Sequence, residues 1–405
     1  MTTPPAARRA GQELRGVEEA ARSLLDLGRP GAQPAGAVVG VLLDGVESVA
    51  AEGLAVLGDG RAQRPMTVDT LIDLASVTKV ASTTALTMRL VADDVLRLDE
   101  PVATYLPTFA GIGSGVGVGG RHRAAVTVRD LVQHTSGLPP WLPLYCRTTD
   151  RGEALAIAAQ TPLARDPGTA CTYSDLGMIV LGAVLEAVTG LRQDAALARL
   201  VLEPLGLGHT AYGPVPADQA AASADSDVVE HTMVATGDPY PTPHQVHDFD
   251  GWRDAPVVGA ANDGNAAHAL AGVAGHAGLF ATIPDLLTLA RSLVDPEVVP
   301  EGVIREFTRP QRLASDRSLG FALMTATVAG ERVPLAVHVG FTGTWLGVAL
   351  DRDLVVAAAA TRLHGTTGSI RRPGTSRDHL VTTTEIAATA LDHLDLARQE
   401  RTGAR

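Results

Sequence analysis

The sequence predicts an α/β (α+β) protein in which both ends of the chain build one antiparallel sheet and a helical lobe is inserted between them. Strand-like runs cluster near the two ends, in residues 37–57 and 333–361, and helical patterns dominate between them. With 45% hydrophobic residues, the 405-residue chain can bury a sizeable core. We expect a discontinuous sheet lobe from residues 12–72 and 283–398 and a mainly helical lobe from residues 73–282.

Apolar spacing and turn-forming residues predict the helices, the hairpin and a loop in the first half of the chain. Residues 12–27 carry apolar side chains at helical spacing, and two β-rich runs flank Asp44-Gly45, a dipeptide typical of a hairpin turn. A helix is expected from Ser76 to about Val91. The stretches "VTVRDLVQ" and "YSDLGMIVLGAVLEAVTG" predict two more, the second ending at Gly190. The run "GIGSGVGVGG" lacks GK[ST] and is interpreted as a surface loop, not a phosphate loop.

Residues 210–265 show no sustained period and are rich in Pro, Asp and His, which predicts a long lid or substrate loop. His244-x-x-His247 in this segment could bind a metal, but no Cys or Glu stands at ligand spacing. We therefore predict neither a metal nor a cofactor. After residue 283 a helix is followed by short strands, with residues 351–353 at a turn, and by a final helix.

Composition excludes several classes of function. A net charge of −12 and a pI near 5.4 argue against nucleic acid and anionic membranes as partners. Cys146 and Cys171 do not make a disulfide framework. No N-terminal apolar run would serve as a signal peptide, and no stretch approaches the ~20 apolar residues of a membrane helix. The sequence thus predicts a cytoplasmic protein and leaves its oligomeric state open.

Lys79 is the only lysine; the other 32 of the 33 basic residues are arginines. Arginine replaces lysine on most surfaces but cannot release its proton. Ser76 lies three residues upstream, so on a helix the two side chains share a face. Lowering the pKa of a lysine from ~10.4 to near 7 takes about 4–5 kcal/mol, which burial away from anions can supply. The competing interpretation is that a chain which otherwise uses arginine kept this one lysine by chance.

Three motifs follow in order: Ser76-Val77-Thr78-Lys79, Tyr173-Ser174-Asp175 and His338-Val339-Gly340. Together with "LRLDEPVATYLP", "VTVRDLVQHTSGLP", "GVAGHAGLFAT" and "HVGFTGTWLGVALDRDLVV", they resemble the serine β-lactamase and penicillin-binding-protein superfamily, specifically its class C β-lactamase and family VIII esterase branch. The resemblance spans most of the chain and implies a β-lactamase/transpeptidase-like fold. It is far less specific for the substrate.

The resemblance also implies roles for individual residues. Ser76 would be the nucleophile, at a helix N-terminus that favours developing negative charge. Lys79 would take its proton, or hold Tyr173 as a phenolate, and Tyr173 would relay the proton to the leaving group. The backbone N–H groups of Ser76 and Phe341 would form the oxyanion hole. For Tyr173, half-buried packing is the competing interpretation.

Two residues depart from the β-lactamase pattern. Asp175 stands where the second motif normally ends in Asn, and two interpretations stay open: a substrate-facing acceptor or a cap of the following helix. His338 replaces a lysine that is common in β-lactamases, and it is neutral much of the time at pH 7. Both changes favour a neutral ester or amide over a β-lactam. Gly340 completes the substrate-facing third motif, and Trp141 and Tyr145 either line an acyl pocket or pack in the core.

The leading hypothesis is a serine hydrolase of esterase type that acts on a small ester or amide through an acyl-Ser76 intermediate. The alternative is an acyltransferase or transamidase of secondary metabolism, with an amine or alcohol as acceptor. A β-lactamase or D-Ala peptidase is disfavoured because both normally act outside the cytoplasm. A non-catalytic sensor is disfavoured because Ser76, Lys79 and Tyr173 are intact. No G-x-S-x-G occurs, which argues against an α/β-hydrolase. His134 and His276 recur in the family pattern and are expected to form buried structural hydrogen bonds.

Overall fold

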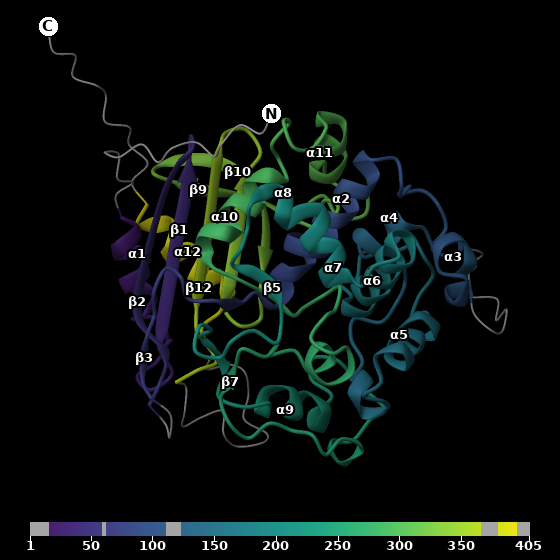
Figure 1. Ribbon diagram of the computed structural model, residues 1–405, viewed down its shortest axis with the longest axis horizontal. Helices are drawn as coiled ribbons and strands as arrows, with labels where there is room; N and C mark the ends of the chain where they lie inside the picture. The colour runs from purple at the N-terminus through teal and green to yellow at the C-terminus, as the bar shows by residue number, and fades with distance from the viewer. Residues whose placement is uncertain (1–15, 59–61, 111–122, 366–379, 395–405) are drawn as a thin grey trace, which may run out of the picture.

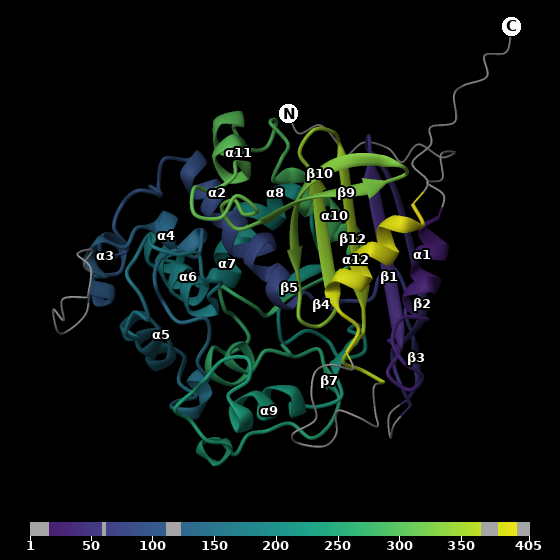
Figure 2. The same cartoon turned by 180° about the vertical axis from the view of Figure 1, so that it is seen from behind.

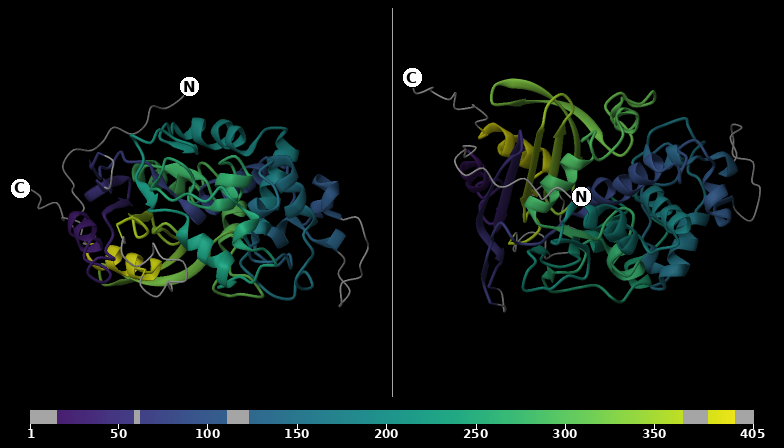
Figure 3. Two further views of the ribbon diagram at one scale, coloured as in Figure 1. Left: turned by 90° about the horizontal axis from the view of Figure 1, so that it is seen from below. Right: turned by 45° about the horizontal axis from the view of Figure 1, so that its top comes forward.

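A computed structural model of the protein describes residues 16–58, 62–110, 123–365 and 380–394. A large sheet stands on one side of the molecule and most of the helices on the other (Figure 1). The two parts also lie side by side when the molecule is seen from below or with its top tilted forward (Figure 3). This agrees with the predicted combination of one antiparallel sheet and an inserted helical region.

The sheet has seven strands, and every neighbouring pair in it is antiparallel. From one edge to the other, the strands are β3 (Arg64–Pro65), β2 (Val46–Val56), β1 (Gly36–Leu43), β12 (Leu354–Ala360), β11 (Thr344–Ala349), β10 (Glu331–Val339) and β9 (Ala322–Val328). The two ends of the chain therefore meet in the centre of the sheet, where Ala37 of β1 lies opposite Ala360 of β12.

The central strands β1 and β12 are apolar along almost their whole length because helices cover both faces of the sheet. Val39 packs on the outer face with α1 (Val17–Leu24) and α12 (Thr383–Asp392), which lie together on that face in Figure 2. Val38 belongs to the larger core on the other face, where α10 (Ile283–Ser292) crosses β1. The sheet thus separates two hydrophobic cores.

The predicted hairpin is confirmed: Asp44 and Gly45 alone join β1 to β2, with φ angles of 49° and 76°. A two-residue type I′ turn requires positive φ at both positions. The predicted N-terminal helix is present as α1, although its expected start at residue 12 lies outside the described residues. The glycine-rich run at residues 111–120 also lies outside them.

The region between β3 and β9 is built of short helices and short strands. The helices are η1 (Ala75–Val77), η2 (Lys79–Thr84), α2 (Ala85–Ala92), α3 (Val102–Tyr105), η3 (Pro107–Ala110), η4 (Arg123–Ala125), α4 (Val128–Val132), η5 (Leu144–Cys146), α5 (Arg151–Gln160), α6 (Asp175–Thr189), α7 (Gln193–Leu197), η6 (Ala198–Leu202), α8 (Glu203–Leu205), α9 (Val228–Thr236), η7 (Val246–Asp248), η8 (Asn265–Ala269), α10 and α11 (Glu301–Thr308). The strands are β4 (Ile72–Asp73), β8 (Leu279–Ala281) and β5 (Thr210–Tyr212) in one small sheet, and β6 (Ala222–Ala224) and β7 (Val257–Val258) in another. Within the described ranges, no helix combines the length and apolarity needed to cross a membrane.

The prediction of an irregular segment at residues 210–265 is wrong for part of its length. The segment contains β5, β6, α9, η7 and β7, which are two to nine residues long and too short for a sequence period to show. The buried Asp227 ties its two halves together. The carboxylate of Asp227 accepts hydrogen bonds from the backbone N–H of Arg253 at 2.9 Å and from its Nε at 2.8 Å.

Gly275, in the loop before β8, lies in direct contact with α6. A Cβ at this position would lie 2.0 Å from the carbonyl oxygen of Met178 and 3.2 Å from the backbone nitrogen of Gly182. Thr83 of η2 donates a hydrogen bond to the carbonyl oxygen of Gly275 at 2.6 Å. The packing of η2, α6 and this loop therefore requires a residue without a side chain at position 275.

Gly275→Ala is expected to lower the free energy of unfolding by about 1–3 kcal/mol, the usual cost of overpacking a core. Chemical denaturation followed by circular dichroism measures it. Gly302→Ala on α11 is the matched control, because no heavy atom lies within 4 Å of a Cβ placed there. Alanine at position 302 should be neutral or stabilise by up to about 1 kcal/mol. Equal stability of the two variants would contradict the contact with α6.

Candidate active site

Ser76 stands in a tight turn that a buried carboxylate holds in shape. The residue before it, Ala75, has a φ of 45°, a left-handed conformation that is costly for a residue with a side chain. Asp73 Oδ1 accepts a hydrogen bond from the Ala75 N–H at 2.8 Å, and Asp73 Oδ2 accepts one from the Asn262 N–H at 2.7 Å. Burial raises the pKa of Asp73 to about 6. The turn presents a half-buried Ser76 between β4 and η2.

Lys79 is fully buried, and its ammonium group faces three oxygen acceptors. Nζ donates to Ser76 Oγ at 2.7 Å and to the carbonyl oxygen of His276 at 3.2 Å. It also forms an ion pair with Asp175 Oδ1 at 2.7 Å. An ammonium group has three N–H donors on one compact atom. The site therefore suits lysine by shape, whereas the longer planar guanidinium of arginine could not reach the three acceptors in the same way.

The expectation that burial away from anions lowers the pKa of Lys79 is wrong. Burial by itself would lower this pKa, but the Asp175 carboxylate, followed by Tyr173, outweighs burial and raises the pKa. Lys79 is consequently held as an ammonium ion. Its sequence environment gave no sign of this, because the carboxylate comes from the start of α6.

Asp175 does not cap α6, so one of its two interpretations is wrong. The cap is Ser174, whose Oγ accepts a hydrogen bond from the Gly177 N–H at 3.0 Å and donates one to the carbonyl oxygen of Pro139 at 2.6 Å. Asp175 is the first residue of the helix, and its side chain reaches Lys79 instead. Serine caps a helix as well as aspartate does. Because Ser174 takes the cap position, the Asp175 carboxylate is free to pair with the Lys79 ammonium group.

Tyr173 completes the cluster around Ser76. Lys79 and Ser76 both act on its hydroxyl to lower the Tyr173 pKa, and the centre of its ring lies 4.8 Å from Lys79 Nζ. Burial raises the pKa of Tyr173, and the positive charge of Lys79 opposes the rise. Because Lys79 donates to Ser76 Oγ, the hydroxyl proton of Ser76 is left for the tyrosine oxygen. His134 supports this arrangement: its ring lies 4.8 Å from that of Tyr173, and its Nδ1 accepts a hydrogen bond from the Ser174 N–H.

The third motif lies against the turn that carries Ser76. Thr342 and Thr344 donate hydrogen bonds to the carbonyl oxygens of Asp73 and Leu74 at 2.8 and 3.0 Å. Gly340 permits this approach, since a Cβ there would lie 1.8 Å from Thr344 Oγ1 and 2.5 Å from the Leu74 carbonyl oxygen. These contacts bring residues 340–344 beside residues 73–74, as a shared oxyanion hole of Ser76 and Phe341 requires.

His338 and Phe341 flank Gly340 in this motif. The His338 ring is buried, with its centre 6.2 Å from that of Tyr173. Burial, followed by the charge of Lys79, lowers the pKa of His338 to about 3, so the imidazole is neutral. The carbonyl oxygen of Phe341 accepts a hydrogen bond from Arg362 Nε at 2.7 Å, which fixes the orientation of that peptide group.

Residues 262–265, with the sequence Asn-Asp-Gly-Asn, link the turn before Ser76 to His276 and to the backbone around Leu144. The sequence analysis did not predict this link. The Asn262 N–H binds Asp73, and Asp263 Oδ1 lies 2.9 Å from Nε2 of His276. The buried Asn265 side chain accepts from the Leu144 N–H and donates to the carbonyl oxygen of Leu142. The three polar residues of this stretch, at the end of the supposed loop, are the signal that could have marked this link. The buried hydrogen bonds expected of His134 and His276 are present.

The two proposed acyl-pocket residues are deeply packed. Trp141 is 3% exposed and lies 6.3 Å, between ring centres, from Tyr240. Tyr145 is 2% exposed and packs against the rings of Phe249 and Trp252 at 4.8 and 5.5 Å. Both residues thus anchor the 210–265 segment. A direct contact with substrate stays a prediction.

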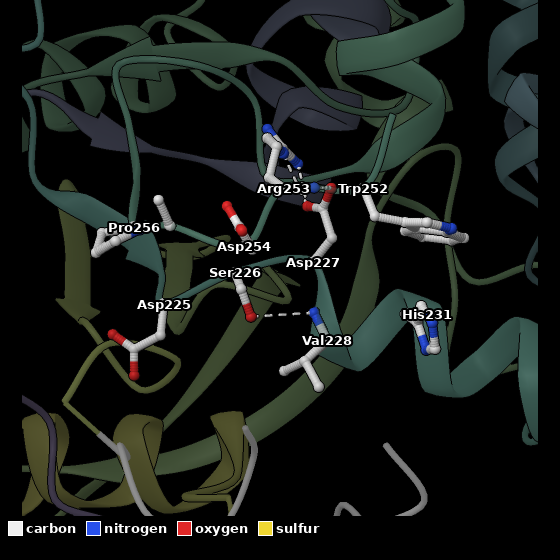
Figure 4. A pocket seen from close by; sticks show the side chains of 10 residues that line it. Asp225, Ser226, Asp227, Val228, His231, Trp252, Arg253, Asp254 and Pro256 are labelled. Atoms are coloured by element: carbon white, nitrogen blue, oxygen red, sulfur yellow. Dashed lines mark hydrogen bonds and ion pairs between the residues drawn. The ribbon is translucent and has the colours of Figure 1, made fainter. Parts of the chain in front are cut away.

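A cavity of about 660 Å³ lies within the 210–265 segment and is separate from the cluster around Ser76 (Figure 4). Its wall includes Asp225, Asp227, Trp252 and Asp254, and no residue of the three motifs is among the described residues that line it. In Figure 4 dashed lines join Asp227 to Arg253. Across the described ranges, no group of three or more His, Cys, Asp and Glu residues is arranged to hold a metal ion.

Comparison with known proteins links this site to a family. The chain matches the family described as "Beta-lactamase" over residues 20–379. A protein of Escherichia coli (strain K12) named "Putative D-alanyl-D-alanine carboxypeptidase" is 29% identical over 304 residues, which cover 69% of this chain. The same match spans 66% of the relative's length, just under two thirds of it.

Solved structures agree in fold. The crystal structure of SurE with D-Leu has 26% sequence identity and a TM-score of 0.56, covering 85% of this chain and 69% of the other. EstCE1, described as "a hydrolase with promiscuous acyltransferase activity", has 21% identity and a TM-score of 0.67, covering 93% and 97%. The β-lactamase-like fold predicted from the sequence is confirmed. Because the family match spans well over half of the chain, this protein belongs to the beta-lactamase family.

Proposed function

We propose that the protein is a serine hydrolase of esterase type, which acts on small esters or amides through an acyl group carried on Ser76. The observation that supports it most is the cluster in which Lys79 contacts both Ser76 and Asp175 at 2.7 Å, with the Tyr173 hydroxyl alongside. A purely structural lysine would not need a half-exposed serine among its partners. The family and the hydrolase EstCE1 support the same class of reaction.

The charges of the cluster suggest how the proton of Ser76 moves. The Asp175 carboxylate, 2.7 Å from Nζ, raises the pKa of Lys79 and so favours its ammonium form over the free amine that a base requires. The proton of Ser76 therefore passes to Tyr173 in its phenolate form, whose charge the ammonium group stabilises. Ser76 Oγ attacks the carbonyl carbon, the N–H groups of Ser76 and Phe341 bind the oxyanion, and Tyr173 returns the proton to the leaving group. Water then enters on the same side and releases the acid.

An acyltransferase is the second candidate, and the reuse of Tyr173 favours it. No glutamate like the one that activates hydrolytic water in class A β-lactamases is evident in the sequence. Deacylation would then depend on Tyr173 and Lys79 once more. These groups activate any nucleophile that occupies the leaving-group position, whether water, alcohol or amine. The promiscuous acyltransferase activity ascribed to EstCE1 adds support.

The covalent intermediate is the direct test. After exposure to a panel of p-nitrophenyl esters, mass spectrometry should find the acyl group on the peptide that contains Ser76, and Ser76→Ala should carry none. Lys79→Arg should lose more than 90% of turnover (over ~1.4 kcal/mol in activation free energy), because a guanidinium cannot satisfy the same three acceptors. Arg305→Lys, an exposed exchange of the same two residue types, is the control and should be fully active. An active Lys79→Arg enzyme would exclude the role given to the ammonium group.

The pH profile tests the role of Tyr173. A base must be deprotonated, and burial raises the pKa of Tyr173, so kcat/KM should rise with pH into the alkaline range. Asp175 also raises this pKa. In Asp175→Asn the acidic limb of the profile should therefore move to lower pH, by about one unit or more. Asp93→Asn removes an equal charge from an exposed ion pair and should leave the profile unchanged. An unmoved limb in Asp175→Asn would count against the phenolate mechanism.

Partition of the acyl group separates hydrolysis from transfer. With rising concentrations of a primary amine or alcohol, mass spectrometry should detect amide or ester in place of free acid, while consumption of the donor ester stays similar. Ser76→Ala measures the uncatalysed reaction of the acceptor with the ester. If free acid is the sole product for every acceptor tried, the transferase hypothesis is lost and the hydrolase remains.

A further inference from the structure

Arg253, in the 210–265 segment, binds a carboxylate and two backbone carbonyl groups at once. Its Nε donates to Oδ1 of the buried Asp227 at 2.8 Å, and its two terminal nitrogens donate to the carbonyl oxygens of Ala261 and Asn262 at 2.8 and 2.9 Å. The planar guanidinium holds its donors in a fixed arrangement. The ion pair with Asp227, drawn as dashed lines in Figure 4, therefore fixes the backbone at residues 261 and 262.

The peptide group that precedes Asn262 is held at both ends. Arg253 binds its carbonyl oxygen, and its N–H donates to Asp73 Oδ2 at 2.7 Å. Asp73 Oδ1 in turn accepts a hydrogen bond from the Ala75 N–H at 2.8 Å. This short chain of hydrogen bonds joins the arginine to the residue that precedes Ser76.

The conformation of Ala75 determines where the Ser76 N–H points. Ala75 has a φ of 45°, and such a left-handed conformation persists in a residue with a side chain only when the surroundings enforce it. The peptide group after Ala75 carries the N–H of Ser76, one of the two donors of the proposed oxyanion hole. The hydrogen bond from the Ala75 N–H to Asp73 thus helps to set the direction of a donor that acts on the reacting substrate.

Both hydrogen bonds of the Asp73 side chain depend on its ionised form. A carboxylate accepts at both oxygens, whereas a protonated carboxyl group has lost one good acceptor and turned it into a donor, which here would face an N–H group. Burial raises the pKa of Asp73 to about 6. The charge of Asp263, which is paired with His276 at 2.9 Å, adds to the rise, and the charge of Arg253 opposes it.

We propose that Arg253 and Asp73 are positioning residues for the oxyanion hole: Arg253 holds the Asn262 peptide against the Asp73 carboxylate and favours its ionised form, and the carboxylate aligns the Ser76 N–H. The proposal rests on the function proposed above and adds how that site responds to acid. When Asp73 takes up a proton, one of its two N–H partners loses its acceptor, and the oxyanion loses an aligned donor. Neither positioning residue touches the substrate in this role.

The pH dependence of kcat/KM for p-nitrophenyl acetate tests the role of Asp73. A base with a raised pKa, Tyr173, gives log kcat/KM a slope of one against pH. Because a second group must also be ionised, the slope should become two below about pH 6. Asp73→Asn has no group that titrates there, so its slope should stay at one. Its rate should be lower by about 10-fold or more, up to the ~10²–10³ of a lost oxyanion donor.

Arg253→Gln should move this break in the profile. Loss of the positive charge raises the pKa of Asp73, so the break should shift to higher pH by about half a unit or more. Arg253→Lys keeps the charge and should hold the break near its wild-type position. Arg151→Gln is the matched control: it removes an arginine of similar exposure, 23% against 21%, from an ion pair with Glu186. Loss of an ion pair alone should leave both the break and kcat unchanged.

Unfolding in acid is separated from this effect by circular dichroism at about pH 5. Asp73 takes up its proton more readily in the folded chain than in the unfolded chain, where its pKa is ~3.9. Its protonation therefore adds stability as the pH falls below about 6. Ala75→Gly gives a second test if the other variants do not fold. Glycine adopts a positive φ without strain, so the Ser76 N–H needs Asp73 less, and the slope below the break should return toward one.

A wild-type slope of one throughout, a break that coincides with loss of the circular dichroism signal, or a break at the same pH in Arg253→Gln would overturn the proposal. Acylation of Ser76 by p-nitrophenyl acetate keeps the two proposals apart. If the wild-type Ser76 is acylated and the break is absent, only the positioning role of Arg253 and Asp73 fails. If no ester acylates Ser76, the proposed function fails.

Discussion

The candidate site depends on one buried positive charge. A fully buried ammonium group is tolerated only where other groups replace its lost hydration. Lys79 finds them in Asp175, Ser76 and the carbonyl oxygen of His276, which belong to the start of α6, the turn after β4 and the loop before β8. Removing one partner of such a pair typically costs ~3–5 kcal/mol, because a charge is left uncompensated. Lys79 thus holds these three chain segments in fixed positions relative to one another and to the Ser76 hydroxyl.

The groups around Lys79 and Ser76 are themselves held in place by residues 262–265. Residues 262–265 bind the carboxylate of Asp73 at one end and the backbone around Leu144 at the other, and between them they anchor the ring of His276. The turn that presents Ser76 and the carbonyl that accepts from Lys79 are therefore fixed by one short stretch of backbone. The 210–265 segment is in this respect part of the framework of the site.

The sequence was sufficient for the fold because its strongest signals are local and short. The Asp44-Gly45 turn, the apolar strands and the ordered motifs each specify structure within a few residues. The state of Lys79 could not be inferred in this way. It depends on whether the Asp175 side chain points to Lys79 or caps α6. Serine and aspartate are both good caps, so the sequence alone does not show that Ser174 is the cap. The place of Arg317 could not be inferred in this way either: its guanidinium carbon lies 5.7 Å from the centre of the Tyr173 ring, although the two residues are far apart in the sequence.

The central pairing of β1 with β12 has a consequence for how the protein comes into being. The backbone N–H of Gly36 donates to Thr361 Oγ1 across 325 positions of the sequence, so the sheet closes only once the residues up to 361 are available. Residues 340–344, which carry the Phe341 peptide, also reach the Ser76 turn only through this late closure. Contacts between such distant positions form slowly, since a long loop must close first. On the ribosome, a nascent chain would hold the serine, the lysine and the tyrosine long before the Phe341 peptide could join them, so the proposed oxyanion hole would form only after β10 to β12 had been synthesised.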